Sequence, residues 1–472
     1  MGTYFMADPY LGLVFLTAIV ASCASADSYT SILTGIPGAS TTAACVIDGY
    51  PMAQNGQAGR AMGIAIADST LNGVLYAILA FSLLPYYGII VTQFGRPELL
   101  GFMTLALASV GFVASKNPWT SMFAIGLGLF VGLVGQDQVG NARFTFDWEY
   151  LAGVGESSHF MIVLLSGLFG IPELLWGLKS GATAIPPKAS ADYWNQLKWG
   201  FSDVRKHWRD SLRGGFIGFV TGLIPGVGGA VGDFLAYGAT KAAHKEPQEV
   251  PFGEGNPIGL VGCEGANNAQ KVSSMIPAML FGIPAAPFAA MVMAIAMYFG
   301  MEIGTPQLLH DKEFVRSMAF GYIFGTIGVA VLSVFLYKWI IKILEVPYWI
   351  YATFIMLVII YANMQYSHSW EDLALLGIFS VMGIFLKFGK ISRPAVLVAF
   401  VVADKFDDYL FQTLRVYRYQ PWGDTFEQRW ENFEWSRLFS ITEHPIFIGA
   451  LVISTLLFLN SFRRKDRGID YT

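Results

Sequence analysis

Two glycine–proline steps in this chain have the residue types and the setting of an anion-binding site inside a membrane. Gly35-Ile36-Pro37-Gly38 in the first half returns as Gly282-Ile283-Pro284-Ala285 in the second half, each time within an apolar, small-residue segment. Because proline fixes φ and lacks a backbone donor, a helix must break at such a step. The half-helix that follows begins with free N–H groups and a partial positive charge, which together bind a carboxylate. The repeated step therefore predicts an anion pocket between two broken helices.

The predicted anion site combines these backbone groups with hydroxyls and one cation. Hydroxyl side chains follow the first break, and a lysine lies in the apolar segment that precedes the second. The predicted residues are Gly35, Pro37, Gly38, Ser40, Thr41, Thr42, Gly282, Pro284, Ala285 and Lys271. For any single step, the alternative is a packing kink or a close helix crossing. Repetition of the step in register favours binding.

A cation site is predicted beside the anion site. Carbonyl oxygens freed at helix ends, together with amide and carboxylate oxygens, suit a hard cation such as Na⁺. The predicted ligands are Asn267, Asn268, Asp27, Ser31, Gly226 and Gly228. Asp68 and Asp233 are proton or cation ligands in one interpretation and interface or satisfied polar residues in the other. Glu264 is expected to cap a half-helix.

Asp27 and Lys271 are the charges that stand out near the breaks, because an isolated charge at that depth costs several kcal/mol. Three interpretations are open. The two side chains pair with each other, or Lys271 binds a substrate carboxylate while Asp27 joins the cation site, or both extend to the membrane interface.

The sequence lacks the patterns of enzymes and of metal or nucleic-acid binding. The six histidines are widely spaced, the three cysteines are isolated, and no nucleophile–base set, phosphate-binding loop or dinucleotide turn is present. A net charge of −4 does not favour a nucleic-acid partner. We expect no enzymatic activity, no metal site and no cofactor other than a bound Na⁺.

The composition is that of an integral membrane protein, with 54% hydrophobic and only 14% charged residues and a mean hydropathy of +0.50. Long apolar runs and broken segments together predict about 11–13 membrane elements. The runs are 9–26, 61–94, 97–115, 117–135, 159–178, 314–341, 347–363, 371–387 and 445–461, and the broken segments are 28–47, 214–240 and 256–300. The first run lacks the basic start of a cleavable signal peptide.

The expected fold is an all-α polytopic membrane protein of two inverted repeats with broken helices and re-entrant hairpins. Residues 1–178 form the first repeat and 214–472 the second. The stretch 179–213 between them reads as an amphipathic, interfacial connector, or alternatively as a solvated one. Basic residues place this connector and the C-terminus in the cytoplasm. The polar stretch 405–444 then lies outside, as a partner-binding segment or a surface loop.

Several motifs resemble the large membrane subunit of the tripartite tricarboxylate transporters, over nearly the whole chain. The first-half motifs are Asp48-Gly49-Tyr50-Pro51-Met52-Ala53, Gly56-Gln57-Ala58-Gly59-Arg60-Ala61, and Gly135-x-Asp137 with Arg143-Phe144-Thr145-Phe146. The second-half motifs are Pro225-Gly226-Val227-Gly228-Gly229, Glu264-Gly265-Ala266-Asn267-Asn268-Ala269 and Gly282-Ile283-Pro284. The Asp-Gly-Tyr-Pro-Met-Ala string is the most specific of them.

The resemblance implies a transporter of the bacterial inner membrane that imports a carboxylate. It further implies delivery by a periplasmic solute-binding protein, a small four-helix membrane subunit, a substrate site between inverted repeats and cation coupling. Family members normally begin with an additional hairpin, the first-half counterpart of the 225–229 motif. We expect that another polypeptide supplies this hairpin, that this sequence begins after it, or that the first half works without it. Family members also lack the 411–440 stretch.

Secondary active import of a small di- or tricarboxylate is therefore the predicted function. A passive anion channel and a non-transporting membrane scaffold subunit are the alternatives from other classes. A channel would need a ring-forming charge pattern along a pore, which the sequence does not show. The related binding-protein-dependent dicarboxylate transporters share the mechanism but not the Asp-Gly-Tyr-Pro-Met-Ala string.

Overall fold

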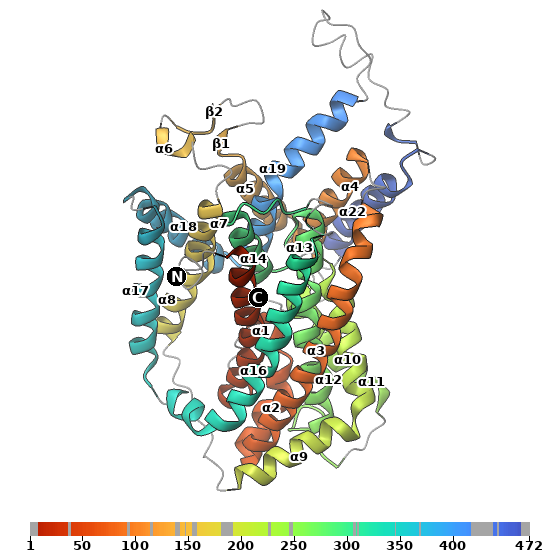
Figure 1. Ribbon diagram of the computed structural model, residues 1–472, viewed down its shortest axis with the longest axis vertical. Coiled ribbons are helices and arrows are strands. Elements are labelled where there is room, and N and C mark those ends of the chain that lie inside the picture. The colour runs from red at the N-terminus through yellow and green to blue at the C-terminus, as the bar shows by residue number, and fades with distance from the viewer. Residues whose placement is uncertain are drawn as a thin grey trace, which may run out of the picture.

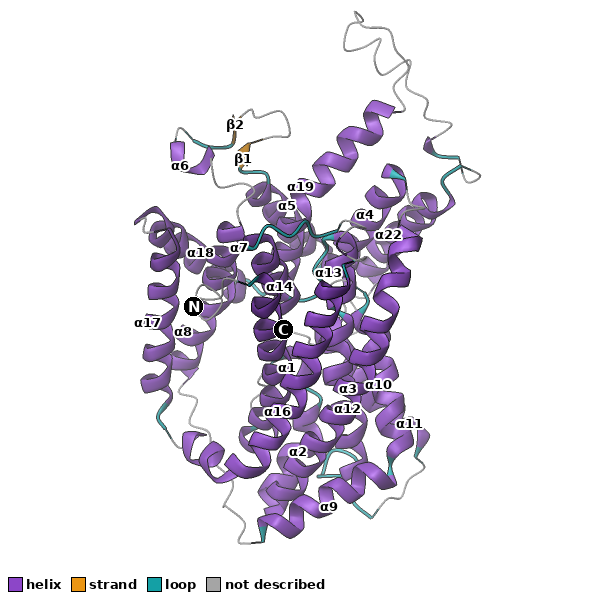
Figure 2. Cartoon of the chain, viewed as in Figure 1, coloured by secondary structure: helices purple, strands orange, loops and turns teal. Residues whose placement is uncertain are grey.

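The structure is a computed structural model, and it is a bundle of helices with two short strands at one end (Figures 1 and 2). Elements are described for residues 8–35, 39–91, 95–113, 117–136, 142–146, 148–152, 158–180, 192–224, 228–244, 249–304, 308, 311–344, 346–367, 370–416, 438–440 and 443–463. The strands β1 (Gly135–Gln136) and β2 (Ala142–Arg143) form an antiparallel hairpin. The prediction of an all-α membrane protein is confirmed in this coarse form, and the small hairpin is the exception that residue patterns did not indicate.

The first half opens on a helix that breaks and resumes. Its elements are α1 (Pro9–Thr34), a 3₁₀ turn η2 (Ser40–Thr42), α2 (Cys45–Met52), a π-helical turn η3 (Ala53–Gln57) and α3 (Ala58–Val91). Asp8 caps α1 by accepting a hydrogen bond from the Tyr10 N–H at 2.9 Å, and Pro9 occupies the first helical position. These local signals fix where α1 begins, and Gly35 ends it in the left-handed conformation.

The second half contains the matching broken helix. Its elements are α9 (Tyr193–Lys206), α10 (Trp208–Gly222), α11 (Gly228–Ala243), α12 (Pro257–Ser273), α13 (Met275–Phe281), α14 (Pro287–Tyr298) and α16 (Lys312–Leu344). Helix α1 packs along α16 while α12 packs along α3, and α16 also packs on α3. We call α1–α3, α9–α14 and α16, with the turns among them, the central body.

The remaining helices flank the central body in two groups. One group consists of α4 (Arg96–Val113), α5 (Pro118–Gly132), α19 (Arg393–Val416) and α22 (Pro445–Arg463). The other consists of α6 (Glu149–Ala152), α7 (Ser158–Leu165), the π-helical turn η4 (Ser166–Gly170), α8 (Ile171–Ser180), α17 (Tyr348–Ser367) and α18 (Trp370–Phe388). Within the described residues, α14 links the central body to both groups through α7 and α19.

Helices α10 and α11 form a hairpin that enters the fold and returns to the same side. Glycines at four-residue spacing let α10 lie directly on the backbone of α12, as in small-xxx-small packing. A Cβ at Gly218 would stand 2.3 Å from the Ala266 carbonyl oxygen. The hairpin closes at its base, where His244, just after α11, contacts Asp210 in the first turn of α10. The broken segment 214–240 therefore lies in a helical hairpin.

Helix α9, in the predicted connector, is docked on α3 at the bottom of Figure 1. Arg60 binds Asp203 with two hydrogen bonds, Nε to Oδ2 at 2.6 Å and Nη2 to Oδ1 at 2.9 Å. Gln196 accepts from the Gly59 N–H at 3.0 Å. The Gly-Gln-Ala-Gly-Arg-Ala motif is thus the surface that holds α9. One face of α9 is packed against protein, and its opposite face exposes aromatic rings such as Trp199.

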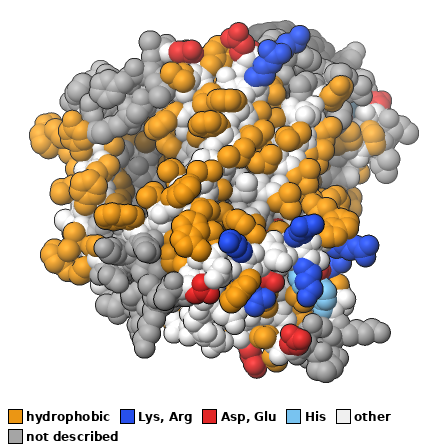
Figure 3. Space-filling model, turned by 60° about the horizontal axis from the view of Figure 1, so that its bottom comes forward, with side chains coloured by type: hydrophobic (Ala, Val, Ile, Leu, Met, Phe, Trp, Pro, Cys, Tyr) orange, Lys and Arg blue, Asp and Glu red, His pale blue; other side chains and the backbone are white. Residues whose placement is uncertain are grey.

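Four helices among the described residues are long and apolar enough to cross a membrane, and shorter apolar helices accompany them. The long segments are Pro9–Thr34, Cys45–Leu84, Phe160–Lys179 and Lys312–Tyr337. Apolar side chains run across the middle of the face shown in Figure 3, and charged groups lie at its upper edge and in its lower part. The other predicted membrane elements include the hairpin and α12, whose glycines and polar residues lower their hydropathy.

Candidate functional site

Both glycine–proline breaks stop their helix with the same backbone geometry. Gly35 has φ 71° and ψ 7°, and Gly282 has φ 68° and ψ 21°. The Gly35 N–H donates to the Ser31 carbonyl at 3.1 Å, and the Gly282 N–H donates to the Ala278 carbonyl at 3.0 Å. Only glycine adopts this left-handed conformation without strain, which explains why each break carries a glycine at this position.

The chain also resumes helical structure in the same way after both breaks. Ala39 (φ −145°, ψ 168°) and Ala286 (φ −153°, ψ 160°) are extended residues that precede the next helical turn. Their carbonyls accept from the N–H three residues on, Thr42 at 3.1 Å and Ala289 at 3.0 Å. The sequence repeat is therefore a repeat of local structure.

Helices α1 and α12 cross in opposite directions, and an ion pair lies at the crossing. Lys271 Nζ is 2.7 Å from Asp27 Oδ2, and the two side chains are 4% and 26% exposed. The antiparallel direction follows from a ladder of side-chain contacts, in which Ser25 meets Asn268 and Ser28 meets Glu264. The structure thus selects the paired arrangement of Asp27 and Lys271.

Glu264 is fully buried beside this pair. Its Oε2 accepts hydrogen bonds from Ser28 Oγ on α1 at 2.9 Å and from Ser69 Oγ on α3 at 3.2 Å. A buried carboxylate is stable only when polar groups surround it. Glu264 therefore joins α1, α3 and α12 at one point, and it contributes more to the site than its sequence position indicated.

The two asparagines of α12 complete the group. Asn267 Nδ2 donates to the Ala24 carbonyl at 2.9 Å and to Ser28 Oγ at 3.0 Å. Asn268 Nδ2 donates to the Ser69 carbonyl at 3.1 Å. Both amide oxygens are buried and have no hydrogen-bond partner among the described residues. We define the central polar cluster as Asp27, Ser28, Ser69, Glu264, Asn267, Asn268 and Lys271.

The residues predicted to bind the anion are not all gathered in this cluster. Because α1 and α12–α13 run in opposite directions, Gly35 lies about 12 Å beyond Asp27 and Gly282 about 16 Å beyond Lys271, on opposite sides of the ion pair. Gly35 lies against the ring of Tyr50, whereas the Gly282 N–H stands near Gly304. The structure thus brings together the charged residues of the prediction and separates the two glycines.

Other members of the predicted anion site have varied surroundings. Thr42 Oγ1 accepts from Ser31 Oγ at 2.7 Å, so the chain doubles back toward α1 after the first break. Thr41 is buried, and its hydroxyl has no hydrogen-bond partner within the described part of the chain. Pro284 and Ala285 are buried. Pro37 and Gly38, and the side chain of Ser40, lie outside the described residues.

The predicted cation ligands divide in the same manner. Asn267 and Asn268 belong to the central polar cluster, and Asp27 forms a salt bridge with Lys271. Ser31 Oγ donates to the Asp27 carbonyl at 2.9 Å and to Thr42. Gly228 is the first residue of α11. Gly226 lies outside the described residues.

Two other buried acids stand next to the hairpin. Asp68 Oδ1 accepts from Asn72 Nδ2 at 3.0 Å and from the Ser211 hydroxyl of α10. Both carboxylate oxygens of Asp233 on α11 are buried without a hydrogen-bond partner among the residues described. Asp68 therefore has hydrogen-bond partners, whereas Asp233 has none among the described residues.

Asp48 has a structural role that the sequence motif did not reveal. Its Oδ1 accepts three backbone hydrogen bonds from the loop before α12, from Gly253 at 2.8 Å, Gly255 at 3.0 Å and Asn256 at 2.8 Å. The loop and α2 are thereby fixed to each other. A signal was available, because an aspartate inside an apolar motif must satisfy its charge.

Three side chains that carry metal-ligand atoms meet at the base of the hairpin, which the wide spacing of the histidines in the sequence did not indicate. His207, Asp210 and His244 each offer a ligand atom, and these atoms lie within 4.8 Å of one another. His207 and His244 are distant in sequence, so only the return of α11 to the base of α10 brings them together.

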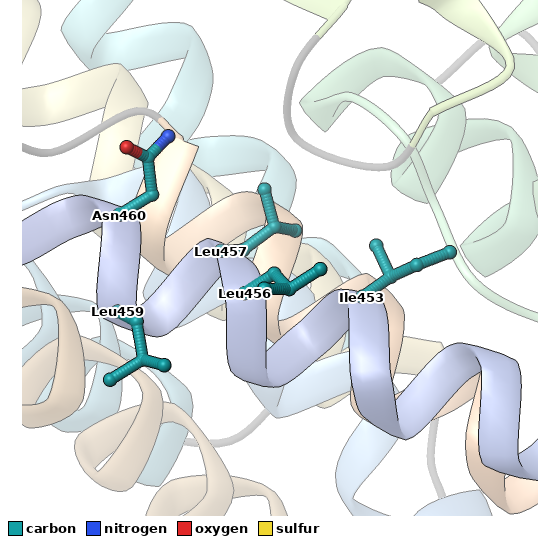
Figure 4. A pocket seen from close by; sticks show the side chains of 5 residues that line it. All are labelled: Ile453, Leu456, Leu457, Leu459 and Asn460. Carbon is teal, nitrogen blue, oxygen red and sulfur yellow. The ribbon is translucent and has the colours of Figure 1, made fainter.

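A shallow pocket on α22 is unrelated to these sites. Figure 4 shows that its lining comes from one helix, with four apolar side chains, among them Ile453 and Leu456, and the amide of Asn460. Without charged or converging polar groups, this surface does not suit an anion.

Comparison with known proteins gives a consistent result. The model of the tripartite tricarboxylate transporter TctA family matches residues 1–398. A protein of Agrobacterium vitis, described as an uncharacterized 52.8 kDa protein in the TAR-I ttuC' 3' region, is 30% identical over 346 residues, which cover 73% of this chain and 67% of that protein. An uncharacterized protein in the TAR-II ttuC' 3' region of the same organism is 30% identical over 131 residues, 28% of this chain and 53% of that protein. No solved structure matches.

Proposed function

We propose a transport mechanism on the premise that this chain belongs to the TctA family of tripartite tricarboxylate transporters. It is accordingly a membrane transport protein and not an enzyme. Members of the family work with a small membrane subunit and a periplasmic binding protein. The proposed function is secondary active import of a small di- or tricarboxylate across the bacterial inner membrane, coupled to a cation.

The buried ion pair between Asp27 and Lys271 is the observation that carries the proposal. Lys271 is a nearly inaccessible cation on α12, and its partner Asp27 is partly exposed. An incoming carboxylate can replace Asp27 at the ammonium group, since both are carboxylates with the same hydrogen-bonding geometry. Freed Asp27 then needs a positive partner of its own, because an uncompensated charge at this depth is costly.

Cation coupling follows from this exchange of partners. A Na⁺ ion or a proton on Asp27 releases Lys271 for the substrate, so each ligand favours binding of the other. Oxygens of Asn267, Asn268 and Glu264 lie in the same cluster and supply further ligands for a hard cation. The cation offsets one of the two or three negative charges of the substrate, which lowers the cost of moving them across the membrane.

Alternating access uses the repeat. The two breaks share their backbone geometry, and α1 packs on α16 as α12 packs on α3, which supports the proposal of two inverted repeats. Such inverted repeats support two related states of one bundle. We propose that the central body moves against the flanking helices, to which it is joined chiefly through α14 in the described part of the chain.

The test is transport of labelled succinate and citrate into proteoliposomes made with the full chain, its small subunit and its binding protein. Lys271→Ala should raise the substrate concentration at half-maximal rate about thirtyfold or more, because removing one member of a buried charge pair costs about 2 kcal/mol or more. Lys198→Ala, an exposed lysine on α9, is the matched control. Unchanged affinity in Lys271→Ala would exclude the carboxylate role of Lys271.

Two further measurements separate the alternatives. Counterflow, in which unlabelled substrate inside the vesicles drives uptake of labelled substrate without an imposed ion gradient, occurs in a carrier and not in a passive channel. A scaffold subunit would support neither counterflow nor gradient-driven uptake. A Na⁺ gradient and a proton gradient, applied in turn, identify the coupled cation.

A further inference from the structure

The base of the α10–α11 hairpin gathers two imidazoles around one carboxylate. His244 Nε2 lies 3.0 Å from Asp210 Oδ2, and His207 Nδ1 lies 3.9 Å from the same oxygen. The two imidazole rings are 6.2 Å apart between centroids. The Asp210 side chain is 6% exposed, while both histidines are partly exposed. A ligand from the aqueous side can therefore reach a largely prearranged set of donors.

We propose that His207, Asp210 and His244 form a binding site for a divalent transition-metal ion, with Zn²⁺ as the best match. Two imidazole nitrogens and one carboxylate oxygen, with water in the fourth position, are a common donor set for zinc. Chelation by three side chains far apart in the sequence distinguishes the site from a simple surface histidine.

The geometry supports a metal better than a hydrogen-bonded histidine pair. The contact between His207 Nδ1 and Asp210 Oδ2 is too long for a hydrogen bond, yet this oxygen is the one that His244 contacts. The ligand atoms lie within 4.8 Å of one another, and ligands about 2.0 Å from a tetrahedral zinc ion are about 3.3 Å apart, so the side chains need to approach by about 1.5 Å at most. His207 lies in the bend between α9 and α10, and His244 follows the end of α11, so neither side chain is held inside a helix.

Arg213 binds the carboxylate oxygen of Asp210 that the two histidines do not contact. Its Nη1 donates to Asp210 Oδ1 at 2.9 Å and leaves Oδ2 for the metal. Such a second partner orients a metal-binding carboxylate and makes it monodentate. The guanidinium therefore fits a supporting role, although it also lowers the affinity by its charge.

The metal would act as a clasp on the hairpin and not as a transported ion. Helix α10 has 15 residues, so its base lies about 20 Å from the tip that approaches Ser273 near the central polar cluster. A bound ion would fasten α11 to the start of α10 and fix the bend toward α9. The hairpin would then be held at its base whatever occupies the transport site.

The test is zinc binding to the purified full chain, carried on a tag without histidines and stripped of metal with a chelator. We expect one Zn²⁺ per chain by elemental analysis after dialysis at micromolar free zinc. His207→Gln and His244→Gln should each weaken binding at least about tenfold, the lower end of the effect of losing a supporting group at a zinc site. His444→Gln is the control, because His444 also contacts a carboxylate, that of Glu98 at 2.5 Å.

Cobalt substitution gives a readout that does not depend on the variants. Co²⁺ bound by the unaltered chain should show the visible absorption bands of a tetrahedral site, and Zn²⁺ should displace them. The proposal is overturned if the chain binds no stoichiometric Zn²⁺, if the Co²⁺ bands are absent, or if folded His207→Gln and His244→Gln, checked by their thermal unfolding, bind Zn²⁺ as tightly as His444→Gln.

Discussion

Lys271 of α12 and Asp27 of α1 form a salt bridge of 2.7 Å at the point where two antiparallel helices cross. The lysine is the more deeply buried partner, and Glu264 and the two asparagines of α12 lie within the next two turns. Each helix leads onward to a glycine–proline break with the same backbone conformation. A buried salt bridge and a buried carboxyl group therefore lie between the two breaks.

The first prediction concerns the salt bridge itself. Asp27→Asn and Lys271→Met should each destabilise the protein, the former by about 3 kcal/mol or more, since it leaves the buried ammonium group without a partner. The double variant should be more stable than the sum of the single effects predicts. Thermal unfolding of all three in detergent measures this coupling, with Lys198→Met as control. Strictly additive effects would show that the pair contributes no interaction energy.

The second prediction concerns the loop held by Asp48. Asp48→Ala should destabilise the protein by about 3 kcal/mol, because three N–H groups lose a charged acceptor. Limited proteolysis should cut the loop at 249–256 sooner than in the unaltered chain. Glu254→Gln alters an exposed acid of the same loop and should behave as the unaltered chain. Equal protease resistance of both variants would contradict the assigned role.

A third prediction tests the close packing of α10 on α12. At Gly218 even a methyl group would collide with the Ala266 carbonyl, so Gly218→Ala should reduce transport and cost about 2 kcal/mol of stability. At Gly238 of α11 nothing lies within 4 Å of an added Cβ. Gly238→Ala should be neutral or stabilise by about 0.5–1 kcal/mol through helix propensity. Identical melting temperatures of the two variants would argue against the packing.

A fourth prediction addresses the docking of α9. Arg60→Lys retains the charge but loses the two-point contact with Asp203, so α9 should be held less firmly on α3. Hydrogen exchange of 193–206 should become faster, with a loss of about 1 kcal/mol in local stability. Arg205→Lys changes an exposed arginine of α9 and is the control. Unaltered hydrogen exchange in Arg60→Lys would mean that the paired hydrogen bonds between Arg60 and Asp203 do not stabilise the docking of α9.

The fifth prediction is a pH dependence at the start of α16. The Tyr10 hydroxyl donates to Asp311 Oδ2 at 2.7 Å and lowers the pKa of that carboxyl below its ordinary value of 3.8. A lowered folded-state pKa stabilises the protein at pH values above the ordinary pKa. This contribution is lost as the pH falls below 3.8 and through the lower folded-state pKa. Asp311→Asn should therefore lower the melting temperature at pH 7 and have a smaller effect near pH 3. An equal effect at both pH values would exclude ionisation as its origin.

The sequence identified the elements whose cause is local. A glycine before a proline in an apolar segment stops a helix wherever it occurs, so both breaks were predictable. Lys271 and Asp27 also attracted attention, because an unpaired charge in an apolar helix needs a partner. Their pairing was one of three open interpretations, and only the crossing of α1 with α12 decides among them.

Contacts that depend on distant segments were beyond the sequence. Asp48 accepts hydrogen bonds from a loop in the other half of the chain, and His207 meets His244 only through the return of the hairpin. The separation of Gly35 from Gly282 is of the same kind, since it follows from the opposite directions of their helices. Such relations are set by tertiary packing, for which residue patterns carry no direct signal.

The glycine contacts between α10 and α12 have one more consequence. The two helix backbones pack closely at Gly214, Gly218 and Gly222, so neither helix can slide along the other by a small distance without steric collision. Any displacement of the hairpin must carry α12 with it, and therefore Glu264 and Lys271 as well. The charged groups therefore move together with α10 and α12 as one rigid unit. A cross-link between α10 and α12 should leave transport activity unchanged.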